Sequence, residues 1–123
     1  MKPPEFTDEE KVRAFVQHCF ESVLGRSGDS SEIEFYTEQI MSGKQSPRLV
    51  AYNFVFSPEF QNKLPGNEQF IRILYRLYLY READEEGLAG WIEELESGVS
   101  LQEIVVGFAD SPEFKAVVRS MKE

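Results

Sequence analysis

The sequence repeats itself, and this internal repeat restricts the possible folds more than any other feature. Residues 15–43 match residues 70–98 at an offset of 55 positions, and residues 46–60 match residues 100–114 at an offset of 54. Both copies close with the same four letters, SPEF. Self-similarity at a fixed spacing of this size indicates a repeated unit of secondary structure.

Helix start and stop signals occur in both repeats. Capping-box spacing is found at Thr7 with Glu10, Asp29 with Glu32 and Ser100 with Glu103, and a capping serine precedes a first-turn proline at Ser46-Pro47, Ser57-Pro58 and Ser111-Pro112. Gly43 and Gly98 stand where a residue with positive φ would close a helix. These signals predict roughly four helices in each repeat, the fourth being short in the first repeat.

Apolar residues recur every three or four positions, as on the buried face of a helix. This spacing assigns to the core Val12, Phe15, Val16, Cys19, Phe20, Val23, Leu88, Trp91, Ile92, Leu95, Leu101, Ile104, Val105 and Phe108. No stretch alternates as a strand does, and 41% of the residues are apolar, enough for a real core. We predict an all-α fold in which two pseudo-repeats of about four helices each, at about 8–63 and 67–122 and joined by Asn62 to Asn67, pack into one globular helical domain over residues 1–123.

Charge and composition argue against several classes of partner. The net charge is -9 and no cluster of Lys or Arg stands out, so we expect neither nucleic acid nor an anionic lipid surface. Charges interrupt the apolar runs well before ~18 residues, and the start of the chain lacks the apolar core of a signal peptide, so we expect no membrane insertion. The lone Cys19 excludes an internal disulfide and a cysteine-based metal site, which leaves the compartment open.

No arrangement of residues indicates catalysis or a cofactor. His18 and Cys19 are adjacent on a helix and point about 100° apart, so they do not form a catalytic dyad. The loops after Asp29 and Asp84 lack the ligand pattern of a calcium-binding EF-hand, and one histidine is too few for a usual zinc site. A pair of carboxylates for glycoside hydrolysis stays open, because the 22 acidic residues offer candidates without singling any out. We expect no enzyme, no metal site and no cofactor.

An Arg-x-x-Asp motif recurs at the same place in both repeats, as Arg26 with Asp29 and Arg81 with Asp84. We interpret it as structural: the arginine satisfies carbonyls at a helix end, the aspartate caps the next helix, and the glutamate of SPEF is a third partner. That glutamate is Glu59 in the first repeat and Glu113 in the second. The alternative is an anion clamp, because an arginine fork suits a carboxylate or a phosphate.

The tyrosine-rich segment from Leu74 to Asp84 carries an additional apolar stripe. Tyr75 and Tyr78 occupy positions that are also apolar in the first repeat and are therefore assigned to the core. Ile73, Leu77 and Tyr80, by contrast, replace His18, Ser22 and Gly25, and they share one helical face with Arg72 and Arg76 at its edge. Either this stripe is buried against the first repeat, or Ile73, Leu77 and Tyr80 together with Arg76 form a docking patch for a partner.

The second repeat resembles a known family. The segment from Leu79 to Phe114, LYREADEEGLAGWIEELESGVSLQEIVVGFADSPEF, is similar to the bacterial domain of unknown function 4214 family, in which GRxxD, GLxxW, LxxG and FxxSPEF follow an apolar helix. The first repeat fits more loosely, through Leu24–Gly43 and Phe54–Phe60. Tyr80 departs from the pattern because it stands where the family usually has glycine, so the helix is expected to end differently there. The aromatic and arginine-rich helix also resembles, more distantly, the helical linker domains of phycobilisomes.

The resemblance implies a small helical module of larger bacterial surface, secreted or glycan-related proteins, and it favours an extracellular or cell-surface location. We expect a non-catalytic interaction or structural module that binds another protein domain. A glycan-binding module, or an accessory domain of a glycan-modifying enzyme, is the alternative, and it is suggested by the same resemblance and by the number of tyrosines.

Overall fold

The structure is a computed structural model of the chain, and it describes residues 5–63 and 65–122. Leu64, in the predicted joint between the repeats, lies outside the described residues, as do the first four residues and Glu123.

Helices make up all the regular secondary structure of the described residues, which confirms the predicted all-α class. In chain order they are α1 (Glu9–Cys19), η1 (Phe20–Leu24), α2 (Ser30–Met41), α3 (Pro47–Val55), α4 (Pro58–Gln61), α5 (Asn67–Leu74), η2 (Tyr75–Leu79), α6 (Glu85–Glu96), α7 (Leu101–Ala109) and α8 (Pro112–Ser120), where η1 and η2 are π-helical. The four-residue α4 is the predicted short helix. None of the helices in the described residues is long and apolar enough to cross a membrane.

Side-chain caps start most of the helices at the predicted residues. The hydroxyls of Ser46, Ser57, Ser100 and Ser111 each accept a hydrogen bond from the backbone three residues later. Asp29 and Glu32 form a complete capping box at the start of α2. The predicted cap at Thr7 is wrong, because Asp8 caps α1 while the Thr7 hydroxyl donates to the carbonyl of Lys122, at the other end of the chain.

Two π-helical turns, η1 and η2, continue α1 and α5 directly, and each ends on a residue in the left-handed region. Gly25 ends η1 with φ of 67°, and Tyr80 ends η2 with φ of 56°. The two ends therefore share a backbone conformation but differ in hydrogen bonding, because the Gly25 amide donates to the carbonyl of Glu21 and no such bond is found for the Tyr80 amide among the described residues. Left-handed backbone is costly for a residue with a side chain, so contacts of Tyr80 must offset the strain.

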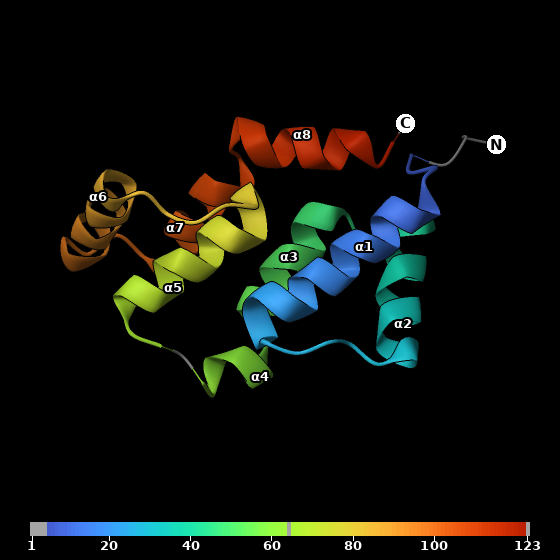
Figure 1. Ribbon diagram of the computed structural model, residues 1–123, viewed down its shortest axis with the longest axis horizontal. Helices are drawn as coiled ribbons and strands as arrows, with labels where there is room; N and C mark the ends of the chain where they lie inside the picture. The colour runs from blue at the N-terminus through green and yellow to red at the C-terminus, as the bar shows by residue number, and fades with distance from the viewer. Residues whose placement is uncertain (1–4, 64, 123) are drawn as a thin grey trace.

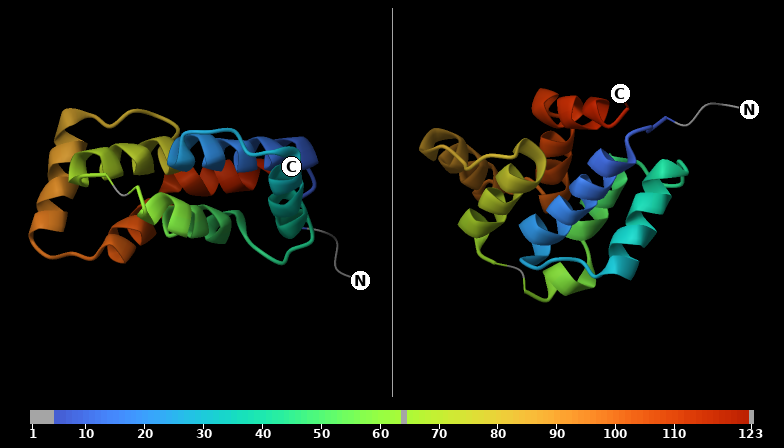
Figure 2. Two further views of the ribbon diagram at one scale, coloured as in Figure 1. Left: turned by 90° about the horizontal axis from the view of Figure 1, so that it is seen from below. Right: turned by 45° about the vertical axis from the view of Figure 1, so that its right-hand side comes forward.

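The helices form two layers around one core. Helices α1 and α5, with their π-helical ends, lie in one layer, and α3 and α7 lie on the other side of the core (Figures 1 and 2). Helix α8 runs along one edge, while α2 and α6 lie at opposite ends of the molecule (Figure 1). The π-helical turn η1, at the end of α1, contacts η2, at the end of α5, and α3 contacts α7.

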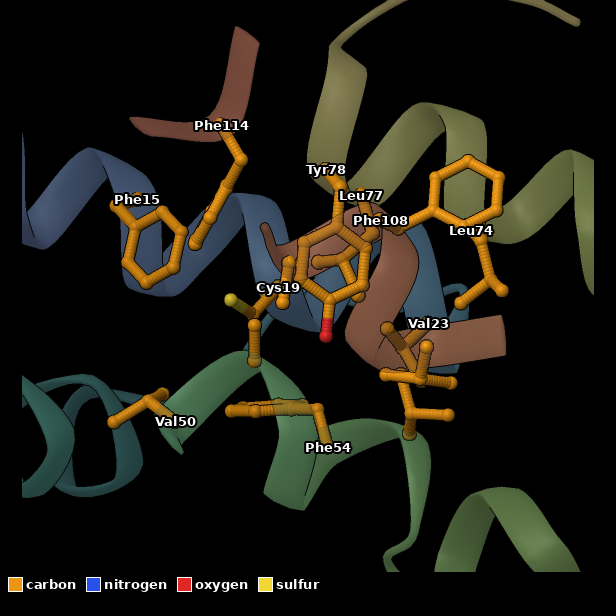
Figure 3. Packing of buried hydrophobic residues seen from close by; sticks show 14 of the residues in the cluster. Phe15, Cys19, Val23, Val50, Phe54, Leu74, Leu77, Tyr78, Phe108 and Phe114 are labelled. Atoms are coloured by element: carbon orange, nitrogen blue, oxygen red, sulfur yellow. The ribbon is translucent and has the colours of Figure 1, made fainter. Parts of the chain in front are cut away.

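The core is one cluster drawn from both halves of the chain. The predicted core residues of α1 and η1 are all buried, and so are Leu88, Ile104, Val105 and Phe108, whereas Trp91, Ile92, Leu95 and Leu101 are half-buried. Tyr78 lies at the centre of the view in Figure 3, with its hydroxyl directed toward α3. That hydroxyl is buried and has no hydrogen-bond partner among the described residues.

Candidate functional site

The predicted stripe of Ile73, Leu77 and Tyr80 does not form one surface. Leu77 is fully buried, at 0% exposure, so its assignment to a docking patch is wrong. Ile73 is half-buried against the core, and only Tyr80 is exposed, at 45%. The prediction assumed α-helical spacing, but the π-helical turn at 75–79 widens the helix, so residues four and seven apart no longer share one face.

Tyr80 contacts the first half of the chain through His18. The two rings stack with their centroids 3.8 Å apart and an angle of 9° between their planes. His18 Nε2 lies 2.9 Å from the carbonyl oxygen of Arg76 and 3.1 Å from that of Leu77, so it donates to carbonyls at the end of η2. His18 thereby caps η2, and the stacked ring of Tyr80 offsets the strain of its left-handed backbone.

Arg76, the fourth residue of the predicted patch, is exposed but already paired. Its Nε donates to Oε2 of Glu82 at 2.8 Å, and its Nη2 donates to Oε1 of the same carboxylate at 3.0 Å. Hydrogen bonding from Arg76 lowers the pKa of the Glu82 carboxyl. The four residues predicted to bind a partner thus do not act together as one site.

The first Arg-x-x-Asp motif forms a closed network, the Arg26 corner, defined by Arg26, Asp29, Glu32 and Glu59. Arg26 Nε donates to Oε2 of Glu59 at 2.9 Å, and Nη1 donates to Oε1 of Glu32 at 3.1 Å. The guanidinium also lies over the ring of Phe20, 5.1 Å from its centroid. Hydrogen bonds from Arg26 lower the pKa of both Glu59 and Glu32. Arg26 therefore ties the start of α2 to the start of α4.

The second Arg-x-x-Asp motif does not form a comparable hydrogen-bonded network. In the Arg81 corner, defined by Arg81, Asp84, Gly87 and Glu113, Arg81 Nη1 lies 3.9 Å from Asp84 Oδ1, the weak limit of an ion pair. No ion pair joins Arg81 to Glu113 within the described residues, so the structure does not bring the predicted third partner to this arginine. Asp84 precedes α6 but makes no side-chain cap.

An unpredicted feature of the surface is an apolar hollow between α3 and α7. Leu49 is 44% exposed and Val106 is 38% exposed, and both line an open hollow of about 410 Å³ with Tyr52 and Arg48. Val106 lies off the apolar stripe of its helix, and this offset was the only sequence signal for the hollow. Exposed aliphatic side chains that share one hollow are typical of a contact surface.

A second hollow, of about 310 Å³, adjoins the first at Arg48 and is basic. Lys115, Arg119 and Lys122 of the α8 segment line it over a floor that includes Phe114. Arg48 pairs with Asp110, and Lys122 pairs with Glu5 at 2.8 Å, but neither Lys115 nor Arg119 has an ion pair within the described residues. The chain has 13 Lys and Arg residues and a net charge of -9, so four of its cations gather here. These four cations do not form one run along the sequence, and two of them are paired with acidic residues.

We call these two hollows, which share Arg48 as a lining residue, the α3–α7–α8 groove. Its defining residues are Arg48, Leu49, Tyr52, Val106, Lys115 and Arg119. The sequence alone does not reveal the groove because Arg48 comes from the first half of the chain, whereas Lys115 and Arg119 come from the second. Only the packing of α3 against α7 brings them together.

The two groups that the sequence analysis considered as a catalytic pair, His18 and Cys19, are engaged in the fold. Cys19 is 0% exposed, and burial raises the pKa of its thiol. Burial also lowers the pKa of His18, whose ring is held between Tyr80 and the end of η2. Within residues 5–63 and 65–122, no group of three or more His, Cys, Asp and Glu side chains is placed to hold a metal ion.

Comparisons with known proteins agree with the resemblance drawn from the sequence. The family model described as Domain of unknown function (DUF4214) matches the chain twice, at residues 1–64 and 51–118. No curated protein and no solved structure matches the chain. These results confirm the family resemblance and are consistent with tandem copies, while the more distant resemblance to phycobilisome linker domains stays a prediction.

Proposed function

Because the chain belongs to the family described as Domain of unknown function (DUF4214), whose description states no activity, we propose a function from its surface. The chain is a non-catalytic interaction module that binds another protein domain through the α3–α7–α8 groove. In this proposal it is part of a larger bacterial protein that is secreted or associated with the cell surface. Its partner is a separate protein or a neighbouring domain.

The observation that supports this function is the adjacency of apolar and basic side chains in an acidic protein. Leu49 and Val106 are exposed in the apolar hollow, and Lys115 and Arg119 carry charges without ion-pair partners among the described residues. An apolar side chain of a partner buries its surface against Leu49 and Val106. Acidic residues next to that side chain form ion pairs with Lys115 and Arg119. Branched aliphatic side chains suit a protein anchor better than a sugar ring, which stacks on aromatic faces.

The non-catalytic part of the proposal is supported by how the reactive groups are used. The Cys19 thiol is buried in the core, and His18 Nε2 is occupied by two backbone carbonyls. Both side chains contribute to packing and capping. Neither lines the groove.

Selection of random peptides displayed on phage, with the intact chain as bait, tests the proposed function. We expect the selected peptides to carry an apolar anchor flanked by Asp or Glu, and to lose binding to Leu49→Asp/Val106→Asp. Ala89→Asp/Gly90→Asp, which adds the same two charges at exposed positions of α6 outside the groove, is the matched control and should keep binding. Peptides that bind all three proteins equally would refute the role of the groove.

Glycan binding is the second candidate, and the exposure of Tyr80 favours it. One face of the Tyr80 ring is stacked on His18, while the side chain is still 45% exposed and can offer an aromatic surface to a sugar ring. A glycan array probed with the wild-type chain and with Tyr80→Ala distinguishes the two functions. Signal that disappears in the variant supports glycan binding, and the absence of signal on the array contradicts it.

A further inference from the structure

Four large hydrophobic side chains are exposed in the described part of the chain, and three of them are not explained by the fold. These residues are Phe35 at 53%, Leu49 at 44%, Tyr80 at 45% and Val106 at 38%. Tyr80 is held in place by its stacking on His18 at the end of η2. Leu49 and Val106 line the groove. Phe35, the most exposed of the four, lies on a different element, α2.

Phe35 projects from an acidic helix surface. Its neighbours Glu34 and Glu38 are both exposed, and its only described aromatic contact is with Tyr36, at 5.1 Å between ring centroids and an angle of 83° between the rings. Arg13 pairs with Glu34 at 3.2 Å, and Glu38 has no ion pair within the described residues. Phe35 is an apolar side chain flanked by negative charge. We call Phe35, Glu34 and Glu38 the Phe35 knob.

The Phe35 knob and the groove are complementary in apolar surface and in charge. The groove offers an apolar hollow of about 410 Å³ between Leu49, Tyr52 and Val106, and next to it the cations Lys115 and Arg119. The knob offers an aromatic ring and, next to it, two carboxylates. Aromatic anchors inserted into apolar pockets, with opposite charges at the rim, are the usual composition of specific interfaces.

We propose that the groove binds the Phe35 knob of a second copy of this chain. This inference rests on the proposed function of the groove and names its occupant. The Phe35 ring inserts between Leu49 and Val106, while Glu34 and Glu38 approach Lys115 and Arg119.

The knob is on α2 and the groove is formed by α3, α7 and α8, so two copies either exchange knobs in a two-fold dimer or associate head to tail. In a head-to-tail pair one copy retains an unoccupied knob and the other an unoccupied groove, so association continues into a ring or an open chain of modules. The knob occurs once per chain because the position that corresponds to Phe35 in the second repeat, 55 residues later, is Gly90. A single aromatic anchor gives a small interface, so we expect weak affinity, in the micromolar to millimolar range.

Sedimentation velocity of the full chain, from micromolar to millimolar concentration, tests self-association directly. We expect the sedimentation coefficient to rise with concentration at low salt, and to rise less in about 1 M NaCl, where the Debye length falls to about 3 Å. We expect Phe35→Ala, which alters an exposed side chain, to raise the dissociation constant about tenfold or more. A wild-type chain that stays monomeric throughout overturns the proposal.

Charge reversal identifies which surfaces meet. Glu34→Lys/Glu38→Lys reverses the knob and Lys115→Glu/Arg119→Glu reverses the groove, so neither variant should associate alone, whereas an equal mixture of the two should. Glu93→Lys/Glu94→Lys changes the net charge as much as the knob variant does, but on α6, and should associate at least as well as the wild type. Circular dichroism verifies that each variant is folded.

The two proposals fail separately in these experiments. Association that persists in Phe35→Ala, or a mixture of reversed variants that stays monomeric, refutes the knob as the occupant. If the phage-selected peptides still require Leu49 and Val106, the groove nevertheless remains a protein-binding site and its occupant is a different protein. If neither the peptides nor the second copy requires the groove, both proposals are refuted.

Discussion

In the Arg26 corner two carboxylates bind the guanidinium at 2.9 to 3.1 Å, whereas in the Arg81 corner one carboxylate lies 3.9 Å away. Both arginines follow a π-helical turn, both lie over an aromatic ring, and both have an aspartate three residues later. The difference therefore does not come from the Arg-x-x-Asp motif itself. It comes from the residues around the motif.

Two substitutions between the repeats account for the missing counterpart of the Glu32 contact, whereas the counterpart of Glu59, Glu113, is present but forms no ion pair with Arg81 within the described residues. Glu32, which binds Arg26 and closes the capping box, is replaced in the second repeat by Gly87. Phe20, under Arg26, is replaced by Tyr75, whose hydroxyl would clash with a Cβ on Gly87. The tyrosine hydroxyl thus fills the space that a glutamate would need. The two corners show that a repeated motif has a structural role only where its neighbours complete it.

The largest expected effect on stability comes from replacing Leu77 of η2 with the residue at the corresponding position of η1. Leu77→Ser introduces the residue found at Ser22 and should lower the free energy of unfolding by about 2–5 kcal/mol, because a fully buried aliphatic side chain is removed. Chemical denaturation measures the loss, with Ser22→Ala as the control at the corresponding half-buried position. A change within about 0.5 kcal/mol, as at an exposed site, would contradict the burial of Leu77.

Rebuilding the Arg26 corner at Arg81 should have the next largest effect. Gly87→Glu alone places its Cβ against the Tyr75 hydroxyl and should cost about 1–3 kcal/mol through overpacking. Tyr75→Phe/Gly87→Glu removes that hydroxyl and supplies both residues of the first corner, so it should recover most of the loss. A double-mutant cycle from denaturation curves measures the coupling, and equal losses in the single and double variants would refute the steric explanation.

Removing each arginine compares the two corners directly. Arg26→Ala should lower the melting temperature clearly and Arg81→Ala only slightly, because only Arg26 ties separate helices together. The pKa values of Glu59 and Glu32 are lowered from their ordinary 4.5, so the stability contributed by Arg26 is present above that pH and is lost as pH falls through the lowered values. Calorimetry at neutral and acid pH should therefore show the two variants converging at acid pH, and equal losses at neutral pH would contradict the difference.

The smallest effect concerns His18, which joins the two π-helical ends. Burial lowers its pKa below 6.5, so the folded chain favours neutral imidazole, and stability should decline slightly as pH falls below 6.5 toward the lowered value. The ring faces Tyr80, Ser22 and backbone carbonyls of η2, and Glu21 is the nearby charge that opposes the shift. His18→Gln, which retains a donor for the carbonyls, should lack this decline. An NMR titration that places the pKa of His18 above 6.5 would contradict it.

Much of the fold could be predicted from the sequence because the signals are local. A serine before a proline, an Asp29-to-Glu32 box and a glycine at a helix end act within one turn, and each is found as predicted. The cap at Thr7 was predicted wrongly because its hydroxyl is used by the carbonyl of Lys122, a contact across the whole chain. The stripe at Leu77 was predicted with α-helical geometry, and the π-helical turn changed its direction.

The candidate site was predicted less well because its residues come together only through packing. The sequence by itself determined the all-α class, the family and most of the core, since helix periodicity and capping depend on residues a few positions apart. Only the tertiary structure decided that Leu77 is buried and that Arg48 lies beside Lys115 and Arg119 in the groove. It also decided that Arg26 binds two carboxylates, whereas Arg81 lies 3.9 Å from one. Each of these depends on which helix surfaces meet, and that is fixed by the packing of the whole core rather than by any one segment.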